Sequence, residues 1–357
     1  MQIGIPREIK TLEGRVALVP AAAAELVASG HKVFIETTAG NISGHSDDDY
    51  RAIGVEVVPD AASLYHEAQL IVKVKEPQES EVRLMRKDQT LFSYLHLAAE
   101  PSLLKHLQDV GLTAIAFETV EEAGGRLPLL APMSDIAGRI AVQVGTHLLH
   151  RPQGGKGILL GGLPATERGR VVILGGGVAG GNSAVMAAAI GAEVVVFDRS
   201  RDKLAAMRQL GNNVTGLYPY ADAIRREVIR ADLVIGAVLL IGERAPHLVD
   251  AQTVRQMEKG SVIIDISIDQ GGCIETIRPT TYANPTYDWE GIVHFGVTNM
   301  PGAVPKTASQ ALSASLLPYV LALAEPDWEQ NPALRAGVNV RAGKVIHPGL
   351  LKSVSAS

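Results

Sequence analysis

The stretch that decides the fold of this chain is Val171-Val-Ile-Leu-Gly-Gly-Gly-Val-Ala-Gly180, followed by Val194-Val-Val-Phe-Asp198. Gly175, Gly177 and Gly180 fill the glycine positions of a G-x-G-x-x-G pattern that comes directly after an apolar, β-branched run. In this pattern the glycines allow a tight turn, close approach of a pyrophosphate and close packing of the next helix on the strand. The amides that begin that helix favour a negatively charged ligand. The stretch therefore predicts a dinucleotide-binding strand–turn–helix–strand unit.

Asp198 indicates which dinucleotide is bound. It lies 23 positions after Gly175, close to the separation of about 20 at which this motif places the acid that hydrogen-bonds the ribose. A carboxylate at this point binds the 2′-hydroxyl of NAD and repels the 2′-phosphate of NADP. Arg199 and Arg201 follow at once and could pair with such a phosphate, but we interpret them as the solvated start of a helix. The predicted cofactor is NAD.

Length and composition restrict the class of protein. At 357 residues the chain is too long for one ordinary core and predicts about two domains. Its 46% hydrophobic and 20% charged residues are typical of a globular protein with a large core. The net charge is −5 and no run of Lys and Arg occurs, which leaves nucleic-acid or anionic-membrane binding without electrostatic support.

Cysteine usage and hydropathy bear on the compartment. The single Cys273 cannot form an internal disulfide, and no zinc-ligand spacing occurs, so we expect no metal site and a reducing environment. No basic, apolar leader precedes the first predicted strand at 2–6. Apolar runs end well short of the roughly 20 residues of a membrane helix. We therefore expect a cytoplasmic protein without membrane segments.

Short β-branched runs alternate with helical patterns along nearly the whole chain. This alternation predicts an α/β fold with two doubly wound, Rossmann-like domains linked by long helices, which we expect over 134–149 and 306–324. The predicted substrate (catalytic) domain is 1–130 plus 306–357, and the predicted NAD-binding domain is 131–305. A glycine-rich loop or hairpin is expected over 154–164. The candidate strands are 2–6, 32–36, 70–75, 91–96, 113–117, 171–174, 194–198, 233–237, 262–266 and 292–295.

Polar side chains at strand ends are the candidate reactive groups, because ligands of doubly wound sheets bind outside the carboxyl ends of the strands. Lys73 and Lys75 alternate on one face at the end of one predicted strand, His96 ends the next, and Asp269 ends a third. Taken singly, these are a snorkelling lysine, a hydrogen-bonded core histidine and an ordinary turn aspartate. Their occurrence together beside a dinucleotide fold favours proton transfer by histidine and polarisation of a carbonyl by a cation.

Several longer motifs resemble one known family over nearly the whole chain, that of the alanine dehydrogenases and pyridine nucleotide transhydrogenases. The resemblance implies reversible oxidative deamination of L-alanine to pyruvate and ammonium with NAD, in a homohexamer. The matching segments are Ile3-Gly-Ile-Pro-Arg-Glu-Ile-Lys10, Glu13-Gly-Arg-Val-Ala-Leu-Val-Pro20, Val72-Lys-Val-Lys-Glu-Pro77, Tyr94-Leu-His-Leu-Ala98, Ala131-Pro-Met-Ser-Asp-Ile-Ala-Gly138, the 175–180 turn, Asp265-Ile-Ser-Ile-Asp-Gln-Gly-Gly-Cys273 and Asn299-Met-Pro-Gly-Ala-Val-Pro305.

The resemblance also implies roles for individual residues. Arg15 would hold the substrate carboxylate, and Lys75 would polarise the carboxylate or carbonyl oxygen. His96 would act as general acid and base, and Asp269 would assist proton transfer during attack of water on an imine. The implied cofactor-binding residues are Ser134, Gly175, Gly177, Val178, Ala179, Gly180, Asp198, Lys203, Leu239, Leu240, Ile266, Ser267, Ile268, Asp269, Val297, Thr298, Asn299 and Met300.

One departure and three alternatives accompany this interpretation. Pro219 and Tyr220 stand where the family often has serines near the adenosine, so we assign Tyr220 no cofactor contact. The first alternative is a transhydrogenase-type NAD(H)-binding module that passes hydride to a partner subunit at a membrane. The second is a dehydrogenase for a larger amino acid, and the third is a non-catalytic NAD sensor. The sequence does not fix the size of the substrate pocket.

Overall fold

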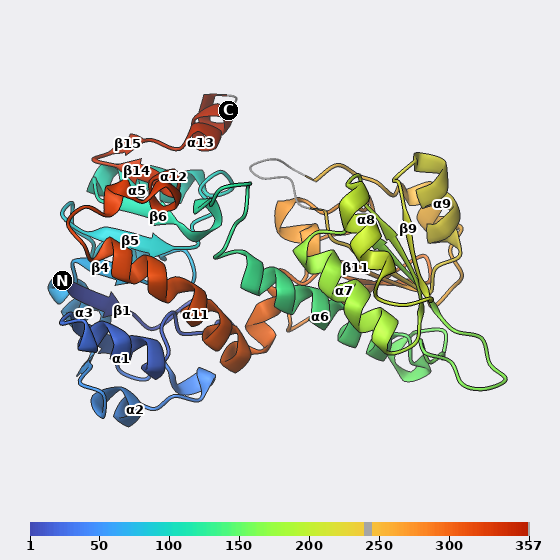
Figure 1. Ribbon diagram of the computed structural model, residues 1–357, viewed down its shortest axis with the longest axis horizontal. Helices are drawn as coiled ribbons and strands as arrows, with labels where there is room; N and C mark the ends of the chain where they lie inside the picture. The colour runs from blue at the N-terminus through green and yellow to red at the C-terminus, as the bar shows by residue number, and fades with distance from the viewer. Residues whose placement is uncertain (239–244, 356–357) are drawn as a thin grey trace. The chain divides into compact units, whose positions relative to one another are not determined.

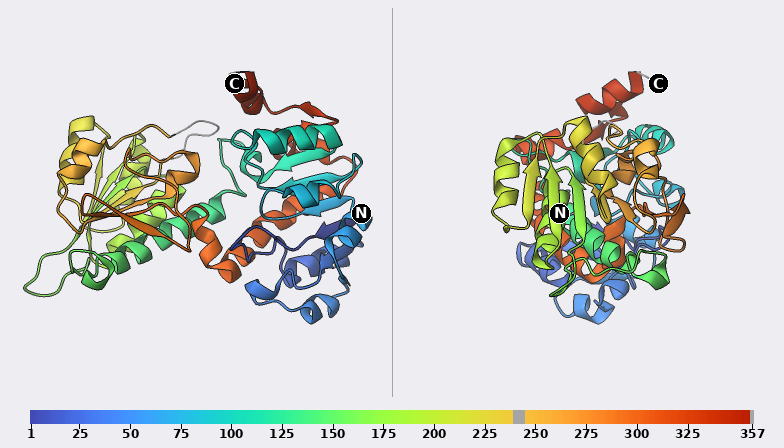
Figure 2. Two further views of the ribbon diagram at one scale, coloured as in Figure 1. Left: turned by 180° about the vertical axis from the view of Figure 1, so that it is seen from behind. Right: turned by 90° about the vertical axis from the view of Figure 1, so that its right-hand side faces the viewer.

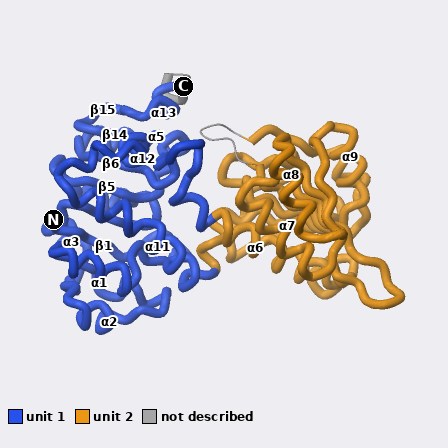
Figure 3. Tube along the Cα trace, in the orientation of Figure 1, with its two compact units in different colours: residues 1–133, 304–357 blue, residues 134–303 orange. Residues whose placement is uncertain are grey.

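The chain forms two compact units, which are coloured separately in Figure 3. The computed structural model describes residues 1–238 and 245–355. The first unit is Met1–Met133 with Val304–Ser357, and the second is Ser134–Ala303. Helix α6 (Ala131–Leu148) carries the chain from the first unit into the second, and α11 (Pro305–Leu323) begins as the chain returns. The functions assigned to the two predicted domains stay predictions.

The first unit contains an eight-stranded sheet in the order β15-β14-β6-β5-β4-β1-β2-β3. Neighbours among β1 to β6 pair in parallel, and β14 and β15 add antiparallel at one edge. The strands are β1 (Gln2–Ile5), β2 (Lys32–Glu36), β3 (Glu56–Val58), β4 (Leu70–Val72), β5 (Thr90–Ser93), β6 (Thr113–Ala116), β14 (Val338–Arg341) and β15 (Lys344–Val345). The helices of this unit besides α11 are α1 (Pro20–Ala28), α2 (Asp47–Arg51), α3 (Ala61–Glu67), α4 (Glu79–Val82), α5 (Pro101–Val110), α12 (Pro332–Ala336) and α13 (Pro348–Ser355).

The second unit contains a seven-stranded sheet in the order β12-β13-β11-β10-β7-β8-β9, parallel except for β12. Figure 1 shows α7 and α8 on one face of this sheet. The strands are β7 (Arg170–Leu174), β8 (Glu193–Phe197), β9 (Val214–Leu217), β10 (Leu233–Gly236), β11 (Val262–Asp265), β12 (Thr286–Trp289) and β13 (Ile292–Phe295). The helices besides α6 are α7 (Val178–Ala189), α8 (Arg201–Arg208), α9 (Ala221–Ile229) and α10 (Ala251–Arg255).

Both sheets have the doubly wound order, in which the chain builds outward from a first strand and then reverses to its other side. The reversal lies between β1 and β4 in the first unit and between β7 and β10 in the second. The predicted α/β class with two Rossmann-like units is therefore confirmed. In each unit, ligands of such a sheet are expected at the carboxyl ends of the strands that flank the reversal.

Close packing between α6 and α7 explains one glycine of the linking helix. A Cβ atom at Gly138 would lie 2.1 Å from the carbonyl oxygen of Ala179, so only glycine fits there. The Ser183 hydroxyl donates to the Gly138 carbonyl oxygen at 2.9 Å and closes the same contact. Helix α6 thereby packs at the start of α7, which directly follows the glycine turn.

Some boundaries differ from the predictions. Helix α6 begins at Ala131 rather than at Ser134, because Pro132 is well tolerated in a first helical turn. The strand predicted over 70–75 ends at Val72, and the strand predicted over 91–96 ends at Ser93. The segment 154–164 forms a projecting loop without strands (Figures 1 and 2).

Among the described helices, none is long and apolar enough to cross a membrane.

Candidate active site

Three predicted site residues of the first unit follow three neighbouring parallel strands. Arg15 follows β1, Lys75 follows β4 and His96 follows β5, and these strands are adjacent in the sheet. Parallel strands end at the same edge of a sheet, so the topology gathers a guanidinium, an ammonium and an imidazole there. Arg15 and Lys75 flank the reversal point itself.

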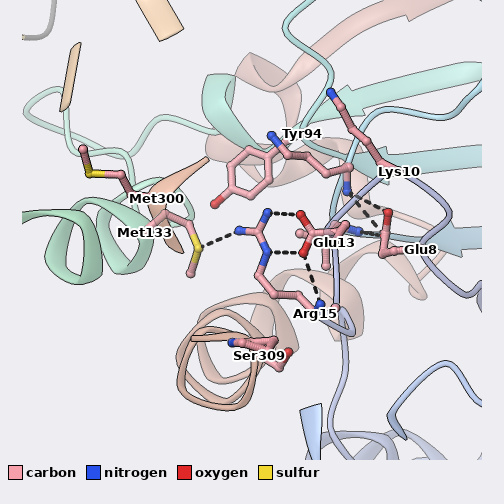
Figure 4. Close-up of polar contacts among 12 residues, drawn as sticks. Glu8, Lys10, Glu13, Arg15, Tyr94, Met133, Met300 and Ser309 are labelled. Carbon is pink, nitrogen blue, oxygen red and sulfur yellow. Dashed lines mark hydrogen bonds and ion pairs between the residues drawn. The ribbon is translucent and has the colours of Figure 1, made fainter. Parts of the chain in front are cut away.

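The guanidinium of Arg15 is buried and held by Glu13, as Figure 4 shows. Arg15 Nε and Nη2 each donate to one Glu13 oxygen at 2.6 Å, in a two-pronged ion pair. Arg15 Nη1 points to the Met133 sulfur at 3.1 Å. Burial alone would lower the pKa of Arg15, but the hydrogen bonds and charge of Glu13 outweigh it, so the pKa is raised. The guanidinium is thus a fixed cation with a set orientation.

Tyr94 lies beside this guanidinium in Figure 4. Its hydroxyl donates to the carbonyl oxygen of Leu129 at 2.5 Å. Burial raises the pKa of Tyr94, and the nearby charge of Arg15 only partly opposes that shift. Tyr94 is therefore a neutral wall of the site, and its ring stacks parallel to His96 with centroids 6.0 Å apart.

Lys73 and Lys75, which the alternation placed on one face, have different surroundings. Lys73 is 1% exposed and ion-paired with Glu8 at 3.1 Å and Glu81 at 3.4 Å. Burial alone would lower the pKa of Lys73, but these two carboxylates outweigh it and raise the pKa. Lys75 lies beyond the end of β4 and is half-buried. Of the two lysines, Lys75 is the one that is partly exposed, whereas the Lys73 ammonium is enclosed by Glu8 and Glu81.

His96 has a left-handed backbone with φ of +48°, which is uncommon for a residue other than glycine. Its backbone N–H donates to Glu118 Oε1 at 2.6 Å, and Leu95 donates to the same atom at 3.2 Å. The ring remains 44% exposed, with Nδ1 at 3.8 Å from Glu118 Oε1. Strained backbone of this kind persists where surrounding contacts fix it, and it is concentrated at functional sites. Glu118 supplies those contacts here.

In the second unit, the three glycines of the fingerprint have three different surroundings. Gly175 has φ of +104°, and a Cβ there would lie 2.4 Å from the Ala237 carbonyl oxygen. A Cβ at Gly180 would lie 1.8 Å from the Gly175 carbonyl oxygen, which demonstrates the close approach of helix and strand. A Cβ at Gly177 would meet no atom within 4 Å. The first and third glycines are therefore needed by the fold, and the second leaves open space at the start of α7.

Asp198 follows β8 and is tied to the glycine turn. Its Oδ2 accepts the Gly176 N–H at 2.8 Å, and its Oδ1 accepts the Ser200 N–H at 2.7 Å. Lys203 Nζ lies 3.8 Å from Oδ2. Arg199 and Arg201 are exposed, and α8 begins at Arg201 with Ser200 as its cap, as expected for a solvated helix start. The turn and the acid together form one rigid unit.

The other predicted cofactor residues lie in several parts of the second unit. Ser134 lies in the first turn of α6, one helical turn before the contact of Gly138 with α7. Ile266, Ser267, Ile268 and Asp269 form a 3-10 turn after β11, in which Asp269 is exposed. Val178 is exposed, Ala179 is half-buried, and Asn299 has φ of +62° in the loop over 297–300. Leu239 and Leu240 lie outside the described residues.

Both halves of the chain match sequence models of one known protein family. The sequence model of the alanine dehydrogenase/PNT N-terminal domain matches residues 4–137, and that of the C-terminal domain matches residues 141–348. The chain belongs to the alanine dehydrogenase/PNT family. This membership confirms the resemblance and implies a pyridine nucleotide cofactor. Gly177 and the open start of α7 fit a group whose pyrophosphate approaches the backbone closely.

Two relatives in this family are about equally similar to the chain. An alanine dehydrogenase of Halomonas elongata is 50% identical over 97% of the chain and 95% of the relative. The solved structure of an L-alanine dehydrogenase is 51% identical, with a TM-score of 0.95, covering 100% of this chain and 99% of that one. A transhydrogenase structure from Sinorhizobium meliloti has a TM-score of 0.85 at 23% identity, over 98% and 99% of the two chains, and shows a shared fold.

Sequence reasoning missed the carboxylates around the predicted site of this family member. Glu13, Glu118 and Glu8 hold Arg15, His96 and the backbone of Lys75. Asp265 was also missed: it is fully buried and accepts the N–H groups of Ser267 and Cys273 at 2.8 and 2.7 Å. Burial raises the pKa of Asp265, and these hydrogen bonds only partly oppose that shift. Glu13 and Arg15 are only two positions apart, whereas Glu8 and Glu118 are far along the chain from Lys75 and His96.

Substitution by alanine should have different effects at the second and third glycines of the fingerprint, Gly177 and Gly180: the first should weaken NADH binding and the second should lower the melting temperature. Gly177→Ala places a methyl group in open space with an ordinary φ of −73°, so the protein keeps its melting temperature. The methyl obstructs a pyrophosphate and weakens NADH binding roughly tenfold, or about 1.4 kcal/mol. Fluorescence titration and a thermal melt measure both effects.

Gly180→Ala is the matched control. Its methyl overlaps the Gly175 carbonyl oxygen, so the melting temperature falls. Gly177→Ala protein that binds NADH with unchanged affinity would exclude a pyrophosphate contact at this turn.

Proposed function

We propose that this chain catalyses the reversible, NAD-dependent oxidative deamination of L-alanine to pyruvate and ammonium. The observation that carries the proposal is the gathering of Arg15, Lys75 and His96 at adjacent strand ends, in a chain with a dinucleotide fingerprint. Relatives that are about half identical over nearly their whole length bear the name alanine dehydrogenase, which supports the same reaction.

The substrate-side roles follow from charge and geometry. Arg15 is assigned to the substrate carboxylate because a guanidinium suits that group. Glu13 accepts from Nε and Nη2 and so sets the orientation of the guanidinium. Lys75 polarises the carbonyl oxygen of pyruvate, which favours attack on the adjacent carbon. The buried, neutral Tyr94 excludes water from one side of the contact between Arg15 and the substrate carboxylate.

Proton transfer is assigned to His96 with Asp269. In the deaminating direction, water attacks the imine carbon and must lose a proton, and His96 takes it as general base. In the reverse direction the same imidazole returns the proton as general acid. Histidine suits this exchange because its ordinary pKa lies near neutrality. The resemblance implies that Asp269 would assist this proton transfer.

The cofactor side uses backbone groups and one acid. The turn at Gly175–Gly180 and the first amides of α7 hold the pyrophosphate, and Asp198 binds the ribose hydroxyls. The redox chemistry, removal of hydride from the alanine Cα, would be supplied by a nicotinamide dinucleotide bound at these residues. The preference for NAD rests on Asp198, since its charge repels a 2′-phosphate. Ser134, Lys203, the 266–269 turn and the 297–300 loop supply the remaining contacts. We also propose a cytoplasmic homohexamer, as the resemblance implies.

The reaction is tested with the purified full chain. We expect formation of NADH from L-alanine and NAD, consumption of NADH with pyruvate and ammonium, and little turnover with NADP or larger amino acids. Tight NADH binding without turnover in either direction would reject the proposal in favour of a transhydrogenase-type module or an NAD sensor. Turnover confined to a larger amino acid would reject alanine as the substrate.

His96→Ala is expected to lower kcat in both directions by roughly 10²- to 10⁴-fold, the usual contribution of a general acid or base. NADH affinity stays unchanged, because the fingerprint belongs to the other unit. His106→Ala removes an exposed histidine from α5 and serves as the control with normal kcat. Near-normal turnover by His96→Ala would remove the imidazole from the mechanism.

Asp198→Ala is expected to narrow the preference for NAD over NADP by roughly 10- to 100-fold in kcat/KM, since hydrogen bonds to charged groups contribute about 1.5–3 kcal/mol. Asp202→Ala removes an exposed acid from the first turn of α8 and controls for a general change in charge. An unchanged ratio of the two kcat/KM values would show that selection between the cofactors lies elsewhere.

A further inference from the structure

Lys73 is a buried cation whose role in the proposed reaction is unassigned. Its ammonium group contacts Glu8 Oε2 at 3.1 Å, Glu81 Oε1 at 3.4 Å and the carbonyl oxygen of Lys75 at 2.9 Å. An ammonium has three N–H donors, and these three contacts use them all. Lys73 therefore acts on the protein and not on a ligand.

The contacts of Lys73 and Glu8 converge on the backbone of Lys75. The Lys75 N–H faces both Glu8 oxygens at 3.4 Å, and the preceding Val74 N–H donates to Glu8 Oε1 at 2.6 Å. The Lys75 carbonyl oxygen accepts from Lys73 and also from the Ser93 hydroxyl at 2.7 Å. The peptide groups on both sides of Lys75 are thus fixed by buried side chains.

The same charges join the Lys75 segment to the Arg15 segment. Glu8 belongs to the stretch between β1 and α1 that also contains Arg15. A second ion pair, Lys10 with Glu76, connects the same two stretches nearer the surface. Arg15 and Lys75 lie on the two sides of the sheet reversal, so these pairs span the reversal point.

Burying these charges costs desolvation free energy, which argues that they have a specific role. Removing an ammonium and two carboxylates from water costs several kcal/mol per ion, and an apolar replacement of a buried ion pair is often neutral or stabilising. Burial raises the pKa of Glu8, with the charge of Lys73 opposing. An apolar side chain at Lys73 would fill the space but could not bind the carbonyl oxygen of Lys75.

We propose that Lys73 and Glu8 are positioning residues that fix Lys75 relative to Arg15, so that both reach one substrate molecule. The inference rests on the proposed function for its kinetic consequence. Its structural content, a Lys75 backbone held by buried charges, can be tested without any turnover.

Lys73→Met is the main test, and Lys156→Met is its matched control. Lys156 is also a mostly buried lysine between two carboxylates, Asp232 and Glu258, each at 2.7 Å, but it belongs to the second unit. We expect Lys73→Met to raise the KM for both L-alanine and pyruvate by about 10- to 100-fold, the scale of loss for misplaced groups. The Kd for NADH should change by no more than about twofold. A tenfold change would correspond to about 1.4 kcal/mol of binding free energy. Lys156→Met should lower the melting temperature without changing the KM for alanine.

Ser93→Ala provides a milder second variant if Lys73→Met does not fold. It removes a hydroxyl that faces the carbonyl oxygens of Lys75 at 2.7 Å, Tyr94 at 2.9 Å and Val74 at 3.5 Å, and it leaves the buried charges in place. We expect a smaller rise in the KM for alanine with a normal affinity for NADH. Folded variants with normal KM values for alanine and pyruvate would overturn the proposal.

Hydrogen–deuterium exchange separates this inference from the proposed function. The amides of Val74 and Lys75 should exchange slowly in the wild-type chain and faster in the folded Lys73→Met variant. If Lys73→Met does not fold, the same comparison is made with Ser93→Ala. This result would stand even if the wild-type protein failed to oxidise alanine, because it reports the backbone directly. Unchanged exchange of both amides in the folded variant would overturn the positioning role.

Discussion

The reversal of strand order beside the first strand of each sheet is the constraint on which both candidate sites depend. Parallel strands end at one edge, and the connections on the two sides of the reversal leave in opposite directions. In the first unit this places Arg15 after β1 and Lys75 after β4. In the second it places the glycine turn after β7 beside the chain that leaves β10, where Gly175 approaches the carbonyl oxygen of Ala237. The chemistry assigned to the two units therefore rests on the same topological feature.

Carboxylates hold the candidate reactive groups of the first unit. Glu13 holds the Arg15 guanidinium, Glu118 holds the left-handed backbone of His96, and Glu8 holds the peptide that precedes Lys75. Such groups cost free energy to bury, and their partners offset much of that cost. An arrangement of this kind fixes orientation before a substrate arrives, which is the property that electrostatic catalysis requires.

In the second unit, shape contributes more than charge. The close approach of α7 to β7 leaves no space for a side chain at Gly180, and α6 approaches α7 with equally little space at Gly138. The start of α7 is thereby held on two sides, while Gly177 faces open space. Asp198 adds hydrogen bonds to the turn, so the acid and the amides keep a fixed geometry.

The sequence by itself determined the α/β class, the dinucleotide fingerprint and the positions of Arg15, Lys75 and His96 along the chain. All of these except Arg15 follow from local patterns: apolar periodicity, glycine spacing and polar residues at strand ends. Arg15 follows only from the resemblance to the family. Only the tertiary structure decided that Lys73 is a buried structural cation, and that Glu8, Glu13 and Glu118 hold the site. It also decided that β4 ends at Val72. The physical reason is that an ion pair such as Lys73 with Glu8 joins residues 65 positions apart. Such a pair leaves no periodic signal, because its partners meet only when β1 and β4 become neighbours in the sheet.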